Sequence, residues 1–232
     1  CEIFYKNKKK LSKTITKNIE LEGQSVTQQD LQKDWTQLLG TSDWDSAQAL
    51  TIGNNGSIYL AGQTGGDIDG QDNSGVAFGS FLATYDSSGK EEGIVLLRSD
   101  DYVAITGLTT GSDGSIYVAG TTGGDLSGQV NSGGHDAFLA KYDPSDGNNQ
   151  WTQLLGSGGY VGAHSITTGI DGSIYIAGRT ENDLDEQLNQ GGYDAFLVKY
   201  DSSGTKQWTE LLGSSNDDYA YALSTGNDGS IY

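Results

Sequence analysis

The side chains best suited to chemistry in this sequence are carboxylates and amides that gather in three similar loops. The loops span residues 65–74, 123–132 and 181–190, and each places an Asp, a Gln and an Asn at matching positions. Carboxylate and amide oxygens are the ligands that Ca²⁺ prefers, about six to eight at a time. The pattern therefore marks a candidate calcium site in these loops, whose candidate ligands are Asp67, Asp69, Asp125, Asp183 and Asp185.

A second interpretation of the same residues needs no metal. Asp and Asn side chains stabilise turns by hydrogen bonding to nearby backbone groups. The spacing also departs from an EF-hand loop, because Asp67-x-Asp69 is not followed by a third ligand, a Gly and a distal Glu. The structural turn is the simpler interpretation, and calcium binding is kept beside it as a hypothesis.

The sequence shows no pattern typical of a catalytic site. It has two histidines, and His135 falls where the other copies of the repeat have Phe78 and Tyr193, which predicts an aromatic packing role. His164 aligns with residues that share no chemistry, so neither a zinc site nor a Ser-His-Asp triad is supported. No glycine-rich segment has the spacing of a phosphate-binding loop. We therefore expect no enzymatic activity and no cofactor apart from calcium.

The acidic loops belong to a unit that the chain repeats. The phrase Gly-Ser-Ile-Tyr occurs four times, at spacings of 58, 58 and 57 residues, each time preceded by Asn or Asp. A period this regular indicates an array of one structural unit in which each unit packs against its neighbours.

Four apolar runs make up each unit. In the best-formed copy they span residues 102–110, 115–122, 136–142 and 150–155, and all are rich in β-branched and aromatic residues. The Asn-Gly or Asp-Gly pair between the first two runs is typical of a hairpin, and we expect both of its residues to supply positive φ angles. Each repeat is therefore predicted to be a four-stranded antiparallel meander.

Apolar side chains on both faces of such a sheet predict that it is sandwiched between neighbours. Phe138 and Ala140 point to one side of the third run, and Ala137 and Leu139 point to the other. Radial stacking of four-stranded sheets is the β-propeller. The predicted fold is thus all-β, a β-propeller with four-stranded antiparallel blades of 57–58 residues.

Counting the runs predicts an incomplete ring. A lone outer strand at Trp35–Leu39 precedes complete blades at about 47–98, 102–156 and 163–213, and a truncated blade follows. Propellers typically have about four to eight blades, so we expect the complete protein to contain several more repeats. The tryptophans of the fourth strands are expected to pack between blades: Trp35, Trp151 and Trp208.

The repeats resemble a bacterial β-propeller family, the SBBP or seven-bladed β-propeller repeat, over about residues 34–232. The matching pieces are Asp45-Ser-Ala47, the run from Gly56 to Thr64, Asp136-Ala-Phe-Leu-Ala-Lys141, Asp194-Ala-Phe-Leu-Val-Lys199 and Asp218-Tyr-Ala220. Val103 and Val161 depart from the family pattern, which has Asp at these positions. The resemblance implies a propeller blade and a bacterial protein that is secreted or attached to the cell surface.

Charge is divided unevenly along the chain. Residues 1–33 form a polar, Lys-rich linker or arm, whereas residues 34–232 carry 6 basic and 27 acidic side chains. An acidic surface repels phosphate backbones, so nucleic-acid binding is not expected. No stretch has the roughly 20 apolar residues of a membrane span.

These observations predict a non-enzymatic repeat scaffold of a secreted or cell-surface bacterial protein that binds protein or carbohydrate ligands. The alternative is a propeller-fold hydrolase or lyase with its active site in the central channel. A channel lined by Asp, His or Arg would favour the enzyme. The first runs of the repeats, such as Ala47–Thr51 and Ala163–Thr167, are instead rich in Ala, Ser and Thr, which favours the scaffold.

Overall fold

The structure of the protein is a computed structural model that describes residues 35–73 and 78–232; the predicted Lys-rich arm at residues 1–33 lies outside them. The described residues form strands and no helix, which confirms the all-β class and leaves no helix there that could cross a membrane. The strands are β1 (Asp45–Ile52), β2 (Ile58–Thr64), β3 (Gly79–Tyr85), β4 (Glu91–Leu97), β5 (Val103–Thr110), β6 (Ile116–Thr122), β7 (Asp136–Tyr142), β8 (Asn149–Leu155), β9 (Val161–Thr168), β10 (Ile174–Thr180), β11 (Asp194–Tyr200) and β12 (Lys206–Leu212).

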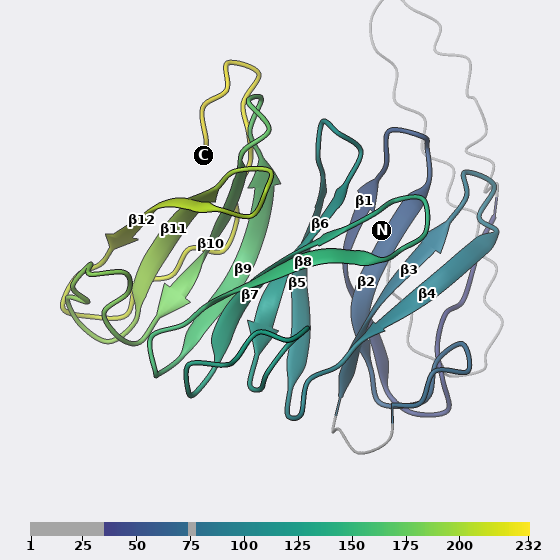
Figure 1. Cartoon of the computed structure of the whole chain (residues 1–232), viewed down its shortest axis with the longest axis horizontal. Coiled ribbons are helices and arrows are strands. Elements are labelled where there is room, and N and C mark those ends of the chain that lie inside the picture. The colour runs from purple at the N-terminus through teal and green to yellow at the C-terminus, as the bar shows by residue number, and fades with distance from the viewer. Residues whose placement is uncertain (1–34, 74–77) are drawn as a thin grey trace, which may run out of the picture. The chain divides into compact units, whose positions relative to one another are not determined.

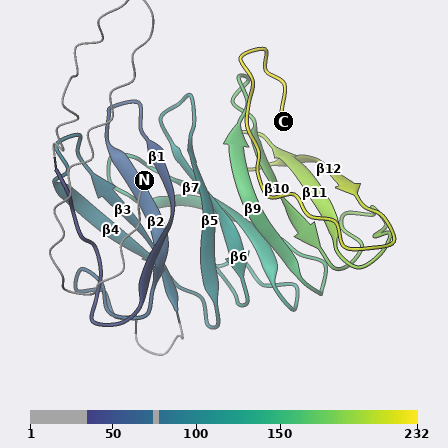
Figure 2. The same cartoon turned by 180° about the vertical axis from the view of Figure 1, so that it is seen from behind.

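The twelve strands form three four-stranded antiparallel sheets in which each strand pairs with the next one in the chain. Sheet I contains β1–β4, sheet II contains β5–β8 and sheet III contains β9–β12, and the three stand side by side (Figures 1 and 2). The predicted four-stranded meander is therefore confirmed. The described strands do not close into a ring.

The hairpins between first and second strands correct one detail of the prediction. In sheet I, Gly56 has a φ of 82°, but Asn55 does not have a positive φ. The Asn55 side chain instead accepts a hydrogen bond from the amide of Ser57 at 3.0 Å. The same division holds in the later copies, where Gly114 and Gly172 have φ angles of 83° and 78°. Only the glycine supplies the left-handed conformation, and the residue before it closes the turn through its side chain.

A second glycine, in the middle of each second strand, is required by close approach of the first strand. The register between β5 and β6 shifts between Ile105 and Gly107, which indicates a β-bulge. A Cβ on Gly120 in β6 would collide with the Ala104 carbonyl oxygen and with the ring of Phe138. Glycine is therefore the only residue that fits at this position.

Each sheet buries its faces against the neighbouring sheet. One apolar cluster joins Tyr59 and Leu82 of sheet I to Phe138 and Tyr142 of sheet II. The next cluster joins sheet II to sheet III in the same way, and includes Phe196. All seven residues of β6 are buried. The expectation that identical neighbours would cover a sheet that is apolar on both faces is confirmed.

Threonine hydroxyls connect the first strands of successive sheets. Thr110 in β5 donates to the carbonyl of Ile52 in β1 at 3.1 Å. Thr168 in β9 donates to the carbonyl of Thr110 at 3.3 Å, and Thr225 donates to the carbonyl of Thr168 at 2.9 Å. The hydroxyl-bearing residues of these strands thus hold neighbouring sheets together.

Tryptophan packing at the opposite edge of the sheets, on the fourth strands, also joins neighbours. The Trp151 ring in β8 packs against Tyr117, with centroids 6.0 Å apart, and against Gly204 in the turn between β11 and β12. The Nζ of Lys141 lies over the Tyr117 ring, 5.4 Å from its centroid. Sheet I has Gly93 where sheet II has Trp151, and a Cβ on Gly93 would meet nothing within 4 Å.

Two predicted strands are not formed. Residues 35–39 have no strand partner, but Leu39 packs against the apolar cluster of sheet I and the Trp35 ring lies against Gly89. The segment thus occupies the place that β8 takes beside sheet III, without forming ladder hydrogen bonds to another strand. After β12, the expected first strand of a fourth repeat is represented only by an isolated bridge between Thr225 and Ile231.

Candidate functional site

The acidic loops lie at one end of the sheets, which we call the loop end; it is the lower end in Figure 1. The antiparallel meander brings to this end the connections from second to third strands and those from each sheet to the next. The loop after β2 closes on a tight turn in which Ile68 and Gln71 exchange two backbone hydrogen bonds, at 3.2 and 2.9 Å. Asp69 and Gly70 occupy the turn with φ angles of 48° and 70°. Asp69 is therefore a turn residue of the kind that tolerates positive φ.

The other two loops close in the same way. Ser127 and Gly128 take the turn positions after β6, and Asp185 and Glu186 take them after β10, all with positive φ. Asp185 also forms an ion pair with Lys206 at 2.5 Å.

The remaining predicted ligands stabilise the base of each loop. An oxygen of Asp67 accepts the backbone amide of Asn73 at 2.8 Å, and the Asn73 side chain donates to the Thr64 carbonyl at 3.0 Å. Asp125 and Asp183 accept the amides of the matching Asn residues at 2.9 Å in the other loops. The structural turn predicted from the sequence is thus present in all three copies.

The five carboxylates are distributed over three sheets. Among the described residues there is no group of three or more His, Cys, Asp or Glu side chains that could together hold a metal ion. Asp67, Asp125 and Asp183 accept backbone amides of their own loops, and calcium binding stays a prediction.

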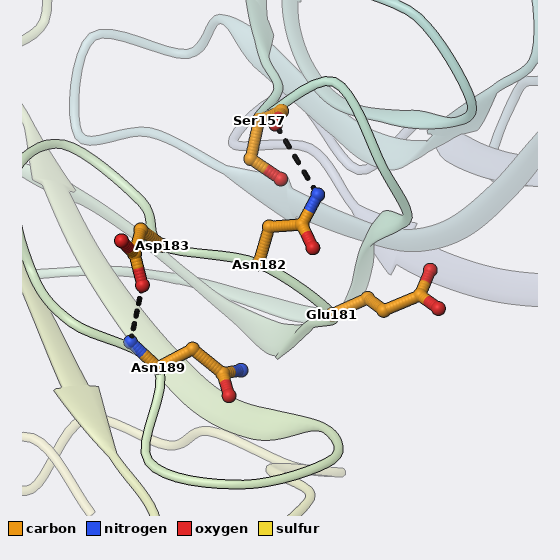
Figure 3. A pocket seen from close by; sticks show the side chains of 5 residues that line it. All are labelled: Ser157, Glu181, Asn182, Asp183 and Asn189. Carbon is orange, nitrogen blue, oxygen red and sulfur yellow. Dashed lines mark hydrogen bonds between the residues drawn. The ribbon is translucent and has the colours of Figure 1, made fainter.

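A polar cavity of about 460 Å³ lies between sheets II and III at the loop end, and Figure 3 shows its lining side chains. Glu181, Asn182 and Asp183 come from the loop after β10, and Ser157 comes from the connection that follows β8. The connection has Gly158 and Gly159 after Ser157, where the earlier connection has two aspartates. Large residues in one loop are therefore matched by small ones in the facing loop.

The feature that the sequence did not reveal is a series of ring contacts across the loop end. One ring precedes the first strand of each sheet, and another precedes the third strand. We call these residues, with one tyrosine that follows β12, the aromatic row: Trp44, Phe78, Tyr102, His135, Tyr160, Tyr193 and Tyr219.

The rings contact one another within and between sheets. Trp44 and Phe78 meet edge to face at 5.5 Å between centroids. From Tyr102 onward each ring contacts the next one in the row. The distances between consecutive ring centroids are 6.0 Å for Tyr102–His135, 5.4 Å for His135–Tyr160, 5.8 Å for Tyr160–Tyr193 and 5.9 Å for Tyr193–Tyr219. His135 therefore packs as an aromatic residue, as the sequence predicted. Aromatic pairs at such distances add stability beyond the area that they bury.

Three rings of the row surround the guanidinium of Arg179. Its central carbon lies 5.1 Å from the Tyr160 centroid, 4.7 Å from Tyr193 and 4.9 Å from Tyr219. The Arg179 Nε is buried and has no hydrogen-bond partner among the described residues. Arg179 is thus held by cation–π contacts with half-buried rings.

The residue that corresponds to Arg179 differs between sheets. The residue before the last one of each second strand is Gln63 in β2, Thr121 in β6 and Arg179 in β10, and of these Arg179 lies against three rings of the row. Burial raises the pKa of the Tyr102 hydroxyl, and a hydrogen bond with Gln63 opposes part of that rise. The rings recur while the side chain at this position changes from amide to hydroxyl to cation.

His164 lies on β9 rather than in the row. Its ring stacks on Tyr221 at 5.4 Å and 10°, and its Nδ1 is 3.0 Å from the Ala220 carbonyl oxygen. Burial lowers the pKa of His164, the hydrogen bond to Ala220 opposes this, and nearby Arg179 lowers the pKa further. The His164 side chain is therefore packed against Tyr221 and the backbone of Ala220.

Comparison with known proteins gives a partial match. No family model matches the chain. A curated relative, named regulatory protein FlaEY from Caulobacter vibrioides, is 32% identical over 139 residues, which are 53% of this chain and 14% of the relative. The match thus covers a small part of that protein.

Proposed function

We propose that residues 34–232 are blades of a bacterial β-propeller of the SBBP type and serve as a non-enzymatic binding scaffold. Three features support the propeller. Each sheet is a four-stranded meander, the sheets bury their faces against one another, and threonine hydroxyls join their first strands. Such an arrangement is typical of radially stacked blades.

The observation that carries the binding role is the aromatic row. It extends over all three sheets at the end where the longest loops lie, and its first two members are well exposed, Trp44 at 47% and Phe78 at 39%. Aromatic side chains with one apolar face and access to solvent are enriched at recognition surfaces, for protein and carbohydrate ligands alike. The scaffold would therefore bind its ligand at the loop end.

The first strands support a scaffold rather than a channel enzyme. Their Thr hydroxyls are engaged in hydrogen bonds between sheets, and the His164 ring stacks on Tyr221. We also propose that the protein is secreted or attached to the cell surface, because the repeats resemble the SBBP family and the array is strongly acidic and poor in cysteine. The regulatory role in the name of the relative belongs to a much longer protein, and it would fit a scaffold that acts by binding.

The test compares two exposed aromatic sites in the full 232-residue chain. The double variant Trp44→Ala, Phe78→Ala removes the most exposed rings of the row. Trp208→Ala is the matched control, because Trp208 is 39% exposed on the outer strand β12, away from the loop end. The purified proteins are titrated with defined soluble polysaccharides and peptides on a biosensor. The proposal requires at least one ligand whose binding falls in the double variant and not in the control; equal loss in both would contradict it.

A further inference from the structure

The third sheet shows how the aromatic row holds a cation. Three rings enclose Arg179. In sheet III, Tyr160 precedes the first strand, Tyr193 precedes the third strand and Tyr219 follows the fourth strand. A guanidinium is planar and weakly hydrated, so it is well suited to lie against ring faces. The chain thus contains an occupied arginine site made of row residues.

Sheet II has three rings of the same origin and spacing. Tyr102 precedes its first strand, His135 precedes its third strand, and Tyr160 follows its fourth strand. Their centroids are 6.0 and 5.4 Å apart, against 5.8 and 5.9 Å in the trio that holds Arg179. We call these three residues the second trio.

In the second trio Tyr160 already contacts Arg179 on the side of sheet III, whereas no cation lies over the rings of Tyr102 and His135 among the described residues. The position of Arg179 is taken by Thr121, which is 5% exposed and whose short uncharged side chain cannot reach over the rings as an arginine does. At Tyr102 and His135 the trio therefore presents a cation-binding arrangement without a cation from the described residues.

Two carboxylates lie beside the second trio. Asp100 and Asp101 lie in the connection that leads to Tyr102, and both are exposed. An oxygen of Asp101 and the Nε2 of His135 both lie within 4 Å of the place that a Cβ on Gly123 would occupy. The connection before Tyr160 has Gly158 and Gly159 in place of the two aspartates.

The trio that holds Arg179 also has a carboxylate beside it, because Asp217 accepts hydrogen bonds from the Tyr219 hydroxyl and the Tyr193 amide, both at 3.1 Å. In that trio the carboxylate accompanies an arginine, which is the arrangement that Asp100 and Asp101 offer in sheet II.

We propose that the second trio binds the guanidinium of an arginine side chain on a protein partner. This rests on the proposed role of the loop end in binding and states the chemistry of the partner. Asp100 and Asp101 supply the charge complementarity, and the rings supply cation–π contacts that a neutral sugar would not exploit. The partner arginine takes the place in sheet II that Arg179 takes in sheet III.

The experiment titrates the full chain with a defined probe, the peptide acetyl-Gly-Arg-Gly-Arg-Gly-amide. Twin peptides replace Arg with citrulline, which has the same shape without the charge, or with Lys, which has the charge without the plane. A neutral oligosaccharide, cellohexaose, is the fourth probe. Dissociation constants and ring-current shifts of the peptide methylene protons are measured by NMR.

The decisive variant is Thr121→Arg, which would fill the second trio from within. Binding of the arginine peptide should fall at least about tenfold, because two or three ring contacts worth roughly a factor of five each are lost together. His135→Leu should weaken binding about fivefold. Trp208→Leu should leave it unchanged. The citrulline peptide should bind at least fivefold more weakly than the arginine peptide.

Two results would overturn the inference. One is equal binding of the citrulline and arginine peptides. The other is undiminished arginine binding by Thr121→Arg in a protein whose unfolding midpoint shows that it is folded. Binding of cellohexaose that depends on Trp44 and Phe78, with no preference for arginine, would overturn this inference and leave the proposed function standing. If none of the probes binds in a way that depends on residues of the aromatic row, both this inference and the proposed function would be overturned.

Discussion

Replacing Arg179 by Met tests whether the cation itself stabilises sheet III. Met keeps a long flexible apolar chain among the three rings and removes the charge. The guanidinium carbon lies 4.7–5.1 Å from three ring centroids, all inside the roughly 6 Å range of cation–π attraction. Half-buried contacts of this kind contribute about 0.5–1 kcal/mol each, or about 1.5–3 kcal/mol together.

An opposing term reduces this figure. The buried Nε of Arg179 has no hydrogen-bond partner among the described residues, and leaving such a donor unsatisfied costs about 1 kcal/mol. The net loss in Arg179→Met should thus be about 0.5–2 kcal/mol of unfolding free energy. For a chain of this size, that lowers Tm by about 1–8 °C.

Urea and thermal unfolding of the full chain at pH 7 measure the loss. Arg179→Lys should be intermediate, because it keeps the charge and loses the planar contact with the rings. A double-mutant cycle with Tyr193→Leu should give a coupling free energy of about 0.5–1 kcal/mol. If Arg179→Met unfolds within about 0.3 kcal/mol of the parent, or the coupling is zero, the cation is not held by the rings and the argument for the second trio loses its precedent.

Other substitutions test the packing between and within sheets. Gly93→Trp should stabilise the protein by about 1 kcal/mol, because the indole would enter open space and pack on Tyr59 as Trp151 packs on its tyrosine; no rise in the urea midpoint relative to Gly93→Ala would contradict this. Gly120→Ala should cost about 3 kcal/mol or prevent folding, since the added Cβ meets a backbone carbonyl of β5, and circular dichroism at rising urea would reveal it. The pKa of Asp171 is lowered to about 2 by the Ser173 amide and then by Lys199, so its stabilisation is present above pH 4 and is lost as the pH falls through 2. Asp171→Asn should accordingly cost up to about 0.5–1 kcal/mol at pH 7 for so exposed a pair and nothing near pH 2, and an equal cost at both values would refute this. Millimolar CaCl₂ should raise Tm, and chelator should reverse the rise, if the acidic loops bind calcium; an unchanged Tm would remove that hypothesis.

The sequence predicted those parts of the fold that depend on contacts close in the chain. The Asn-Gly pair at Asn55 and Gly56 determines its hairpin through a side chain and a φ angle within four residues. Alternation in β7 was enough to show that both faces are apolar. The strand predicted at Trp35–Leu39 is not formed, because it depends on a contact with a strand that is distant in the chain. Its sequence matches that of β8, but a strand requires a partner edge, and the described residues offer none there.

The aromatic row could not be derived from local spacing, because each trio joins three segments that are tens of residues apart. Tyr160 belongs to two trios at once, as the last ring of one sheet and the first ring of the next. Only the stacking of sheets brings it within 5.4 Å of His135 and 5.8 Å of Tyr193. The signal that was available was the recurrence of a ring just before each first and third strand. His135 was recognised in this way, by comparison with Phe78 and Tyr193.

The distribution of constant and variable positions within the repeat supports a binding role for the row. The positions that close the backbone do not vary between copies: the glycine of each second strand, and the Asp and Asn of each acidic loop. Arg179 shows that rings of the row can serve stability, because it fills the trio of sheet III from within. If the second trio served stability alone, it would gain from the same internal cation. Sheet II instead has Thr121 at this position and Asp100 and Asp101 in the connection before Tyr102, an arrangement that fits the proposed cation from a partner.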